Sequence, residues 1–260
     1  MSQNTASTHE NRAYLLIGGA GGIGSALARH LAQAGARLTI AGRDAGKARA
    51  LADDLDAHAL DSLDARDADA VKEAVHAAAE HHGRLDGAVN LPGTIMLKPA
   101  HLTTPDELRE AVEVNLYTAF NLVRSASQAM RKNPDNAGGS IVLMSSAAAT
   151  SGLPNHEAIA AAKAAVAGLA RSAAATYASN GVRVNAVAPG MVRTPLSEPI
   201  LESDVAEKAS VAMHPLGRLG EPADIAGGIA WLLDPGQGWV SGTVLQVDGG
   251  MANLRGRVKV

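Results

Sequence analysis

A run of glycines near the start of the chain constrains the possible folds more than any other feature. It reads Gly18-Gly19-Ala20-Gly21-Gly22-Ile23-Gly24 and directly follows an apolar stretch, Ala13 to Ile17. The residues from Gly22 to Gly35 have apolar side chains at helical spacing. A short buried strand, a glycine turn and a helix are the first unit of a dinucleotide-binding α/β domain.

Three glycines of this run have separate physical tasks. Gly18 allows a tight turn out of the strand, Gly22 lets the backbone approach a diphosphate, and Gly24 lets the helix pack closely on the strand. The free N–H groups and the positive end of the helix then face the phosphates. The cofactor-binding residues predicted in this run are Gly18, Ala20, Gly21, Gly22 and Ile23.

Strand-like and helix-like segments alternate along the rest of the chain. Strands are predicted over Ala13–Ile17, Arg37–Ala41, Asp86–Asn90, Ser140–Ser145, Val182–Val187 and Val244–Val247. Helices are predicted over Gly22–Gly35, Ala45–Leu55, Asp67–His82, Pro105–Arg131, Asn155–Ser179 and Pro222–Leu233. Such alternation is typical of parallel strands joined by right-handed crossovers. We expect an α/β fold with one doubly wound Rossmann-type sheet of about seven strands and helices on both faces.

The domain boundaries follow from the same pattern. Residues 1–12 are polar and are expected to form a disordered arm, and residues 13–260 to form a single domain. The segment 191–218 contains three prolines and a helical stretch, and we expect it to form a lid that covers the substrate. Its apolar residues favour a largely apolar substrate, although they can equally pack against the domain: Leu196, Ile200, Leu201, Val205 and Met213.

Composition narrows the classes of protein further. The 260 residues include no cysteine, which excludes disulfides, thiolate metal sites and a cysteine nucleophile, and no metal site is predicted. A net charge of −3 and 2% aromatic residues argue against a nucleic-acid partner. No signal peptide is recognised, and no apolar stretch is judged long enough to span a bilayer. We therefore expect a cytoplasmic protein without a membrane partner.

The end of the second predicted strand bears on the choice of nucleotide. There the chain reads Ala41-Gly42-Arg43-Asp44, where the adenosine ribose of a dinucleotide should lie. Gly42 offers no carboxylate to the 2′-hydroxyl, and the guanidinium of Arg43 suits a 2′-phosphate. We therefore expect NADP rather than NAD. Alternatively, Arg43 is a solvated surface charge and Asp44 simply caps the next helix.

Several motifs in one order along the chain together resemble the short-chain dehydrogenase/reductase family. They extend over nearly the whole chain from Ala13: Ile17–Gly24, Asp64, Asn90-Leu91-Pro92-Gly93, Asn115, Ser146, Lys163, Asn185–Gly190 with Thr194, Gly217–Asp224, and Val247-Asp248-Gly249-Gly250. The resemblance implies an NAD(P)-dependent oxidoreductase that acts on a carbonyl or alcohol. It also implies a homodimer or homotetramer.

The resemblance assigns a role to each matched residue. Ser146 would bind the carbonyl oxygen, Lys163 would hold the nicotinamide ribose, and Asn115 would orient a water for proton relay. Asp64 would meet the adenine ring. The cofactor-binding residues implied outside the glycine run are Asp64, Ala65, Asn90, Gly93, Lys163, Pro189, Gly190, Val192 and Thr194.

One departure from the family pattern concerns the chemistry directly. The family has a tyrosine thirteen residues after its serine and four before its lysine, and this chain has Ile159 there. In the family, that tyrosine gives the proton to the alkoxide formed by hydride transfer. Loss of a general acid typically costs roughly 10² to 10⁴ in rate. Two lesser departures are Ile17 for threonine and Leu91-Pro92 for asparagine-alanine.

A replacement proton donor is present nearby in the sequence. His156 precedes Ile159 by three residues and Lys163 by seven, which predicts that all three share one helical face. An imidazole has an ordinary pKa of about 6.5 and can donate a proton directly or through water. The competing interpretation places His156 at the rim of the cleft, with Asn155 capping the helix.

Three functions are compatible with these residues. The first is an NADP-dependent oxidoreductase in which His156 or a water supplies the proton. The second is a non-redox enzyme, such as an isomerase or lyase, on the same scaffold. The third is a catalytically inactive NADP-binding sensor or partner subunit. Ser146, Lys163 and Asn115 at matching positions favour an enzyme over the third function.

Overall fold

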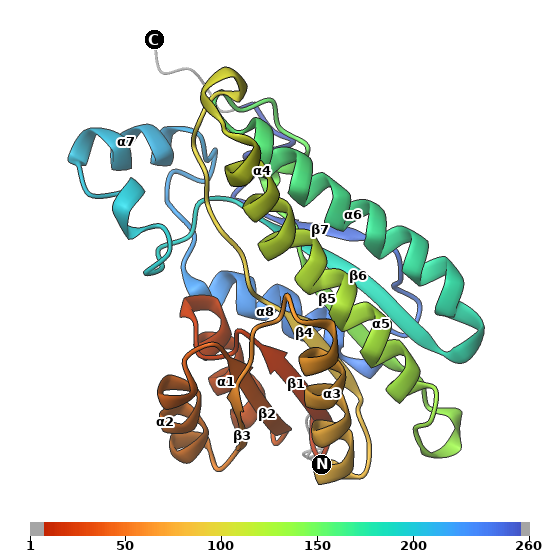
Figure 1. Ribbon diagram of the computed structural model, residues 1–260. Coiled ribbons are helices and arrows are strands. Elements are labelled where there is room, and N and C mark those ends of the chain that lie inside the picture. The colour runs from red at the N-terminus through yellow and green to blue at the C-terminus, as the bar shows by residue number, and fades with distance from the viewer. Residues whose placement is uncertain (1–7, 256–260) are drawn as a thin grey trace, which may run out of the picture.

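Seven parallel strands form one sheet at the centre of the molecule (Figure 1). The computed structural model describes residues 8–255. The strands are β1 (Ala13–Ile17), β2 (Arg37–Gly42), β3 (His58–Ser62), β4 (Gly87–Asn90), β5 (Gly139–Met144), β6 (Val182–Pro189) and β7 (Val244–Val247). Their order across the sheet is β3-β2-β1-β4-β5-β6-β7, so the winding reverses between β1 and β4. The predicted doubly wound sheet of about seven strands is confirmed.

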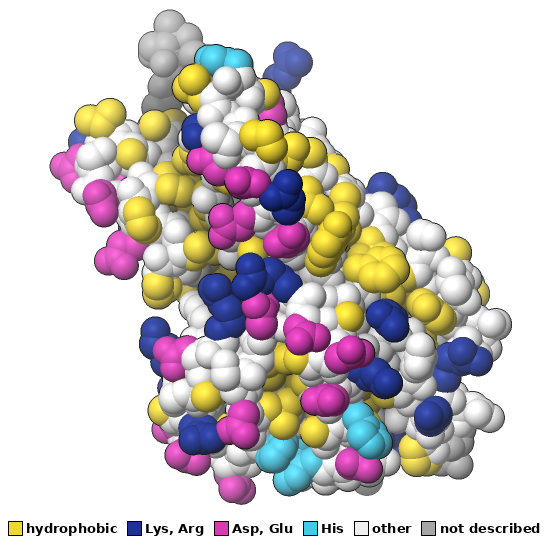
Figure 2. All heavy atoms as spheres, viewed as in Figure 1, with side chains coloured by type: hydrophobic (Ala, Val, Ile, Leu, Met, Phe, Trp, Pro, Cys, Tyr) yellow, Lys and Arg dark blue, Asp and Glu magenta, His cyan; other side chains and the backbone are white. Residues whose placement is uncertain are grey.

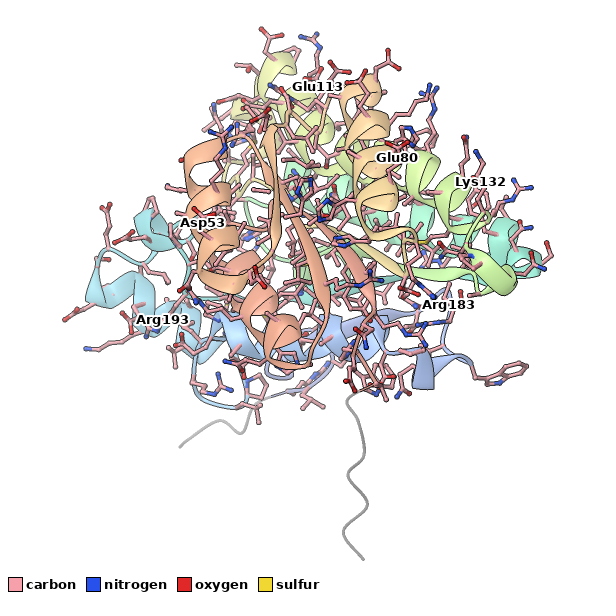
Figure 3. The ribbon with its side chains drawn as sticks, turned by 90° about the horizontal axis from the view of Figure 1, so that it is seen from below. Asp53, Glu80, Glu113, Lys132, Arg183 and Arg193 are labelled. Atoms are coloured by element: carbon pink, nitrogen blue, oxygen red, sulfur yellow. The ribbon has the colours of Figure 1, made fainter. Side chains whose placement is uncertain are left out.

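Helices cover both faces of this sheet. They are α1 (Gly22–Gln33), α2 (Ala45–Leu55), α3 (Ala68–His82), α4 (Pro105–Val112), α5 (Thr118–Met130), α6 (Glu157–Tyr177), α7 (Asp204–Ala212) and α8 (Pro222–Leu233). One cluster of buried side chains joins the sheet to α3, α5 and α6, and a second joins it to α1, α2 and α8. Seen from below, the sheet lies between these two helical layers (Figure 3).

The strand β3 is an element that the sequence pattern did not predict. Its residues, His-Ala-Leu-Asp-Ser, include only two apolar side chains, and the strand pairs with β2 alone at the edge of the sheet. An edge strand buries little of its surface and therefore needs no continuous apolar run. The backbone pairing of β3 with β2 carries Leu63 and Asp64 to the same end of the sheet as the glycine run.

The helix predicted over Pro105–Arg131 is interrupted. A π-helical turn, η2 (Glu113–Tyr117), separates α4 from α5. Asn115 lies within it, and its Nδ2 donates to the carbonyl oxygen of Ala111 at 2.8 Å. Such single π-helical turns are frequent at functional sites, because the extra residue re-aims the side chains around it.

The prediction of a disordered arm is wrong for residues 8–12, and residues 1–7 lie outside the described residues. His9 is only 7% exposed, and its Nδ1 is 2.8 Å from the hydroxyl of Tyr14. The N–H of Asn11 donates to the carbonyl of Gly35, and Arg12 forms an ion pair with Asp86 at 3.1 Å. These contacts attach the segment to the amino-terminal ends of the strands.

The helix α6 belongs to a more apolar stretch than the sequence analysis allowed for. By length and composition alone, the stretch Glu157–Asn180 could cross a membrane. Half of that stretch is buried inside the domain, where Val166, Ala170 and Ala173 join the core cluster against β5 and β6. Its apolar character therefore has an explanation in the packing of a core helix.

Candidate functional site

A cleft opens at the carboxyl ends of β1 to β4, at the point where the winding of the sheet reverses. Its volume is about 520 Å³, within the usual range of small-molecule sites. In doubly wound sheets, ligands bind at this topological switch point. The lining includes the glycine run from Gly18 to Gly24, together with Gly42, Arg43, Asp64, Ala65, Leu91, Pro92, Gly93, Val114, Thr118, Thr194, Pro195 and Leu196.

The glycine run forms a tight turn from β1 into α1. Gly18 has a φ of +78°, which favours glycine, and its N–H donates to Ala41 O at 2.7 Å. A Cβ on Gly24 would lie 2.5 Å from the carbonyl oxygen of Gly18, so close packing of the helix on the turn requires glycine there. A Cβ on Gly22 would lie 2.9 Å from Cγ2 of Thr194, so the segment after β6 lies directly against the glycine turn.

Basic side chains gather at the end of the cleft formed by β2 and β3. Arg43, Lys47 and Arg66 line it, and Figure 2 shows Lys and Arg side chains in the hollow of this face. Lys47 has Asp44 as its ion-pair partner, at 3.7 Å. In the part of the chain that the structure describes, Arg43 has no ion pair. This end of the cleft therefore favours a ligand group that carries negative charge.

Two residues of this end have additional local tasks. Asp44 caps α2, because its Oδ1 accepts from the N–H of Lys47 at 3.0 Å, as the alternative interpretation predicted. Asp64 accepts a forked hydrogen bond from the guanidinium of Arg66, with contacts of 2.6 to 3.0 Å. These bonds and the backbone N–H of Arg66 lower the pKa of Asp64 to about 2. Asp64 thus remains a carboxylate throughout the physiological range.

The residues after β4 continue the wall of the cleft. Asn90 is buried at the end of β4, and its Nδ2 donates to Oγ1 of Thr118 at 3.1 Å. Leu91 and Pro92, which depart from the family pattern, line the cleft. A Cβ on Gly93 would lie 3.2 Å from Oδ1 of Asn115 and 3.3 Å from Nζ of Lys163. A Cβ at this position would therefore crowd both polar groups.

Lys163 and Asn115 are therefore brought together, although the sequence separates them by almost fifty positions. Nζ of Lys163 donates to the carbonyl oxygen of Met144 at 2.9 Å, and burial lowers the pKa of the lysine to about 8. Nδ2 of Asn115 also donates to Oγ1 of Thr94, at 3.0 Å. The two side chains place an ammonium and an amide beside Gly93.

Serine side chains at the end of β5 complete this group. Ser146 follows the strand, and its Oγ accepts from the N–H of Ala148 at 3.1 Å. Ser145 was not among the predicted residues, yet its buried Oγ donates to the carbonyl oxygen of Lys163 at 2.9 Å. It ties β5 to α6 at the level of Lys163. The Ser-Ser dipeptide at the end of an apolar run is the sequence signal for such a contact.

A buried hydrocarbon occupies the position at which the resemblance predicts a tyrosine. Ile159 lies one turn before Lys163 on α6 and is 5% exposed. His156 is the N-cap residue of α6, which begins at Glu157, and its carbonyl accepts from the N–H of Ala160 at 2.7 Å. Its Nδ1 donates to the carbonyl oxygen of Pro154 at 2.7 Å. The alternative in which Asn155 caps the helix is wrong, because the N-cap is His156 and Asn155 has a φ of +62°.

The segment after β6 forms the remaining wall. Pro189 ends β6, Val192 pairs with Gly220, and Thr194 lines the cleft. Ser197, which was not predicted, anchors the turn by donating to Val192 O at 2.5 Å. The predicted cover begins here.

An ion pair fixes the next part of the cover. Arg193 binds Glu207 of α7 at 2.6 Å and projects at the α7 side of the molecule (Figure 3). Leu196 lines the cleft, whereas Val205 on α7 is exposed to solvent. Val205 is therefore not part of the lining of the cleft.

A dinucleotide fits the residues present. The cleft runs from the basic end at Arg43, past the helix N-terminus at Gly22, to the space beside Gly93 where Lys163 and Asn115 meet. Positive charge, free N–H groups and a buried ammonium thus follow one another along the cleft, an order that suits phosphates and ribose. The fold and the site together define a nucleotide-dependent oxidoreductase.

Comparisons with known proteins agree with this class. Residues 18–252 match the family model described as enoyl-(acyl carrier protein) reductase. The chain is 38% identical over 243 residues to cis-4-hydroxycyclohexanecarboxylate dehydrogenase of Sinomonas cyclohexanicum, covering 92% of this chain and 96% of the relative. It is 33% identical to levodione reductase of Leifsonia aquatica, over 93% of this chain and 94% of that one.

The solved structures give the same result. A short-chain type dehydrogenase/reductase from Mycobacterium ulcerans superposes with a TM-score of 0.89 at 32% identity, over 95% of this chain and 92% of that chain. The chain belongs to the short-chain dehydrogenase/reductase family, and its relatives are named dehydrogenases and reductases.

Proposed function

We propose that this protein is an NADP-dependent reductase or dehydrogenase that lacks the family's tyrosine acid. It transfers hydride between the nicotinamide and a carbonyl or alcohol carbon. The observation that carries the proposal is the meeting of Lys163 Nζ and Asn115 Oδ1 beside Gly93, at the end of the dinucleotide cleft. A chain that only stored a nucleotide would have no need of a buried ammonium there, since burial disfavours its charge.

The preference for NADP is supported by the basic end of the cleft. Arg43 follows Gly42 at the end of β2 and lines the cleft without an ion pair among the described residues. A guanidinium binds a phosphate with two parallel hydrogen bonds, whereas an acidic residue at this position would repel it. We therefore expect the 2′-phosphate to bind at Arg43.

The chain's own groups have separate tasks in the reaction. When bound, the dinucleotide supplies or accepts the hydride. The Ser146 hydroxyl donates a hydrogen bond to the substrate oxygen, and Lys163 holds the ribose. Asn115 orients a water. Ile159 brings no proton, so the proton comes either from a water held by these groups or from His156. His156 has Nδ1 bonded to Pro154, which leaves Nε2 as the atom that would carry and release a proton.

The substrate proposed is a ketone or alcohol on a largely apolar ring. Leu196, Pro195 and Leu91 give the open part of the cleft an apolar wall. Two relatives have names that specify cyclohexane or cyclohexadiene alcohols. A cyclic ketone presents its carbonyl at the edge of a compact apolar body, which suits such a wall.

We also propose that the protein assembles as a homodimer or homotetramer. Three large side chains on one continuous stretch, Leu108, Tyr117 and Phe120, are exposed on α4, η2 and α5. Figure 2 shows hydrophobic side chains gathered along this side of the molecule. Apolar groups gathered in this way are typical of an interface with another chain. A cytoplasmic location stays a prediction.

The decisive experiment follows NADPH absorbance with a panel of cyclohexanones and cyclic diones. It compares the natural protein with Ile159→Tyr, His156→Ala and the double variant. We expect slow turnover by the natural protein and a rate roughly 10² to 10⁴ higher for Ile159→Tyr. Slower turnover by His156→Ala, with no effect of that change in the tyrosine background, would assign the proton to His156. Turnover by Ile159→Tyr alone would show a site without redox activity in the natural protein and would contradict the proposal.

A further inference from the structure

His214 is a buried side chain to which neither the resemblance nor the proposed mechanism gives a task. It follows the end of α7 by two residues and is 3% exposed. Its ring lies where three parts of the chain meet. A Cβ on Gly190 would be 2.5 Å from its Nε2, and a Cβ on Gly249 would be 3.5 Å from its Cβ. The ring therefore contacts the segment after β6, the end of α7 and the loop after β7.

Two hydrogen bonds determine which ring nitrogen carries the proton. The N–H of Met191 donates to Nε2 at 3.0 Å, so this nitrogen is an acceptor and is unprotonated. Nδ1 then carries the proton and donates to the carbonyl oxygen of Ser210 at 2.7 Å. Both capacities of the ring are used on backbone groups, one at the end of α7 and the other at Met191, three residues before Thr194, which lines the cleft.

The contact to Met191 orients a peptide of the cofactor-binding segment. Because a trans peptide is planar, an N–H of Met191 that points at His214 turns the carbonyl of Gly190 the opposite way. The backbone groups that follow are bound by another backbone instead of by a side chain. Met191 O accepts from the N–H of Gly220 at 2.9 Å, and the N–H of Arg193 donates to Gly220 O. The orientation of the Gly190–Met191 peptide thus depends on a side chain that belongs to the cover.

We propose that His214 is a positioning residue that couples the docking of α7 to the shape of the cofactor-binding wall. While α7 is docked, His214 fixes the Gly190–Met191 peptide, from which the chain runs on to Thr194 in the wall of the cleft. When α7 moves away, the N–H of Met191 loses its hydrogen bond to Nε2 of His214. Binding of the dinucleotide and docking of α7 therefore stabilise each other reciprocally. This inference rests on the proposed function.

Two substitutions separate this role from simple filling of space. His214→Gln places an amide oxygen where Nε2 accepts from Met191, so it preserves the contact across to the cleft wall. His214→Asn is shorter: it preserves a donor for Ser210 but does not reach Met191. His101→Asn, at an exposed position, is the matched control for the same chemical change.

The first measurement is the Kd for NADPH, from fluorescence titration of each purified variant. The second is amide hydrogen exchange without nucleotide, over peptides that contain Met191 and residues 204–212. We expect His214→Asn to weaken NADPH binding about tenfold, the size of one lost hydrogen bond, and to speed exchange in both peptides. His214→Gln should stay within about threefold of the natural protein, as should His101→Asn.

Several outcomes would overturn the inference. If His214→Asn and His214→Gln weaken NADPH binding equally, the ring of His214 acts only by filling space and not through its hydrogen bond to Met191. Faster exchange at Met191 without any change over residues 204–212 would show that α7 is not coupled to the wall. If the natural protein binds neither NADPH nor NADH, the proposed function fails. The exchange data without nucleotide then still decide whether His214 links the two segments.

Discussion

The ammonium of Lys163 on α6 donates to the carbonyl oxygen of Met144, the last residue of β5, at 2.9 Å. A neutral carbonyl stabilises this cation less than a carboxylate would, and burial lowers its pKa to about 8. Burying the charged Lys163 therefore lowers the free energy of unfolding of the domain. This arrangement leads to the first two predictions.

Replacing Lys163 by methionine should stabilise the free protein and abolish its cofactor-dependent activity. Its pKa is about 8 in the folded chain, against an ordinary 10.5, so the unfolded chain binds more protons between these pH values. The stability of the natural protein therefore rises with pH across that window and carries the full penalty below pH 8. We expect Lys163→Met to raise the free energy of unfolding at pH 7 by about 1 to 3 kcal/mol. Urea unfolding at pH 7 and pH 10 tests this, and a lower stability of the variant at pH 7 would contradict it.

NADPH binding should weaken as the pH rises through about 8. The protonated Lys163 holds the ribose in the proposed mechanism, and it loses its proton near that pH. The Kd should be nearly constant from pH 6.5 to 7.5 and rise about tenfold by pH 9.5. Fluorescence titration in a constant-ionic-strength buffer measures the profile. A profile that persists unchanged in Lys163→Met would assign the titration to another group.

Replacing Arg43 by glutamine should change the choice of nucleotide. Loss of hydrogen bonds to a charged phosphate typically costs about 1.5 to 3 kcal/mol, or roughly tenfold to a hundredfold in Kd. NADPH should lose that affinity, whereas NADH should change less than about threefold. Arg49→Gln is the matched control, because Arg49 is an exposed arginine on α2 that pairs with Asp61. Equal effects of Arg43→Gln on both nucleotides would refute the 2′-phosphate contact.

Acid should destabilise the edge of the sheet near His82. Burial, followed by the neighbouring His81 and Arg37, lowers the pKa of His82 to about 4. Because the ordinary value is 6.5, the unfolded chain binds more protons between pH 4 and 6.5, so stability rises with pH through this window and is lost as the pH falls. His82→Gln should flatten the dependence, whereas His30→Gln at an exposed position of α1 should not. Thermal unfolding from pH 4.5 to 7.5 measures both, and parallel curves for His82→Gln and the natural protein would exclude His82.

The parts of the fold that depend on local pattern could be predicted from the sequence. The turn at Gly18 and the packing at Gly24 follow from the absence of a Cβ, so the glycines alone indicated them. The strand β3 was missed because an edge strand buries one side only and its sequence is half polar. Ile159 was placed correctly beside Lys163, because both lie inside one regular helix.

Positions at the ends of elements were harder to predict. The helix α6 starts at Glu157, two residues after the predicted start, so the N-cap is His156 and not Asn155, because helix boundaries depend on local backbone geometry. His214 carries no sequence signal of its role. Its partners are backbone groups of Met191 and Ser210, which any residue type provides.

The π-helical turn at Glu113–Tyr117 also determines how this family member can tolerate changes in length. It contains one residue more than an α-helical turn, so α4 and α5 are out of phase with each other. Deleting one residue within it would produce a continuous α-helix, but it would rotate α5 by about 100° relative to α4. Either the buried side chains of α5 would leave the sheet or Asn115 would turn away from Lys163. The number of residues between the two helices is therefore as constrained as the identity of Asn115 itself.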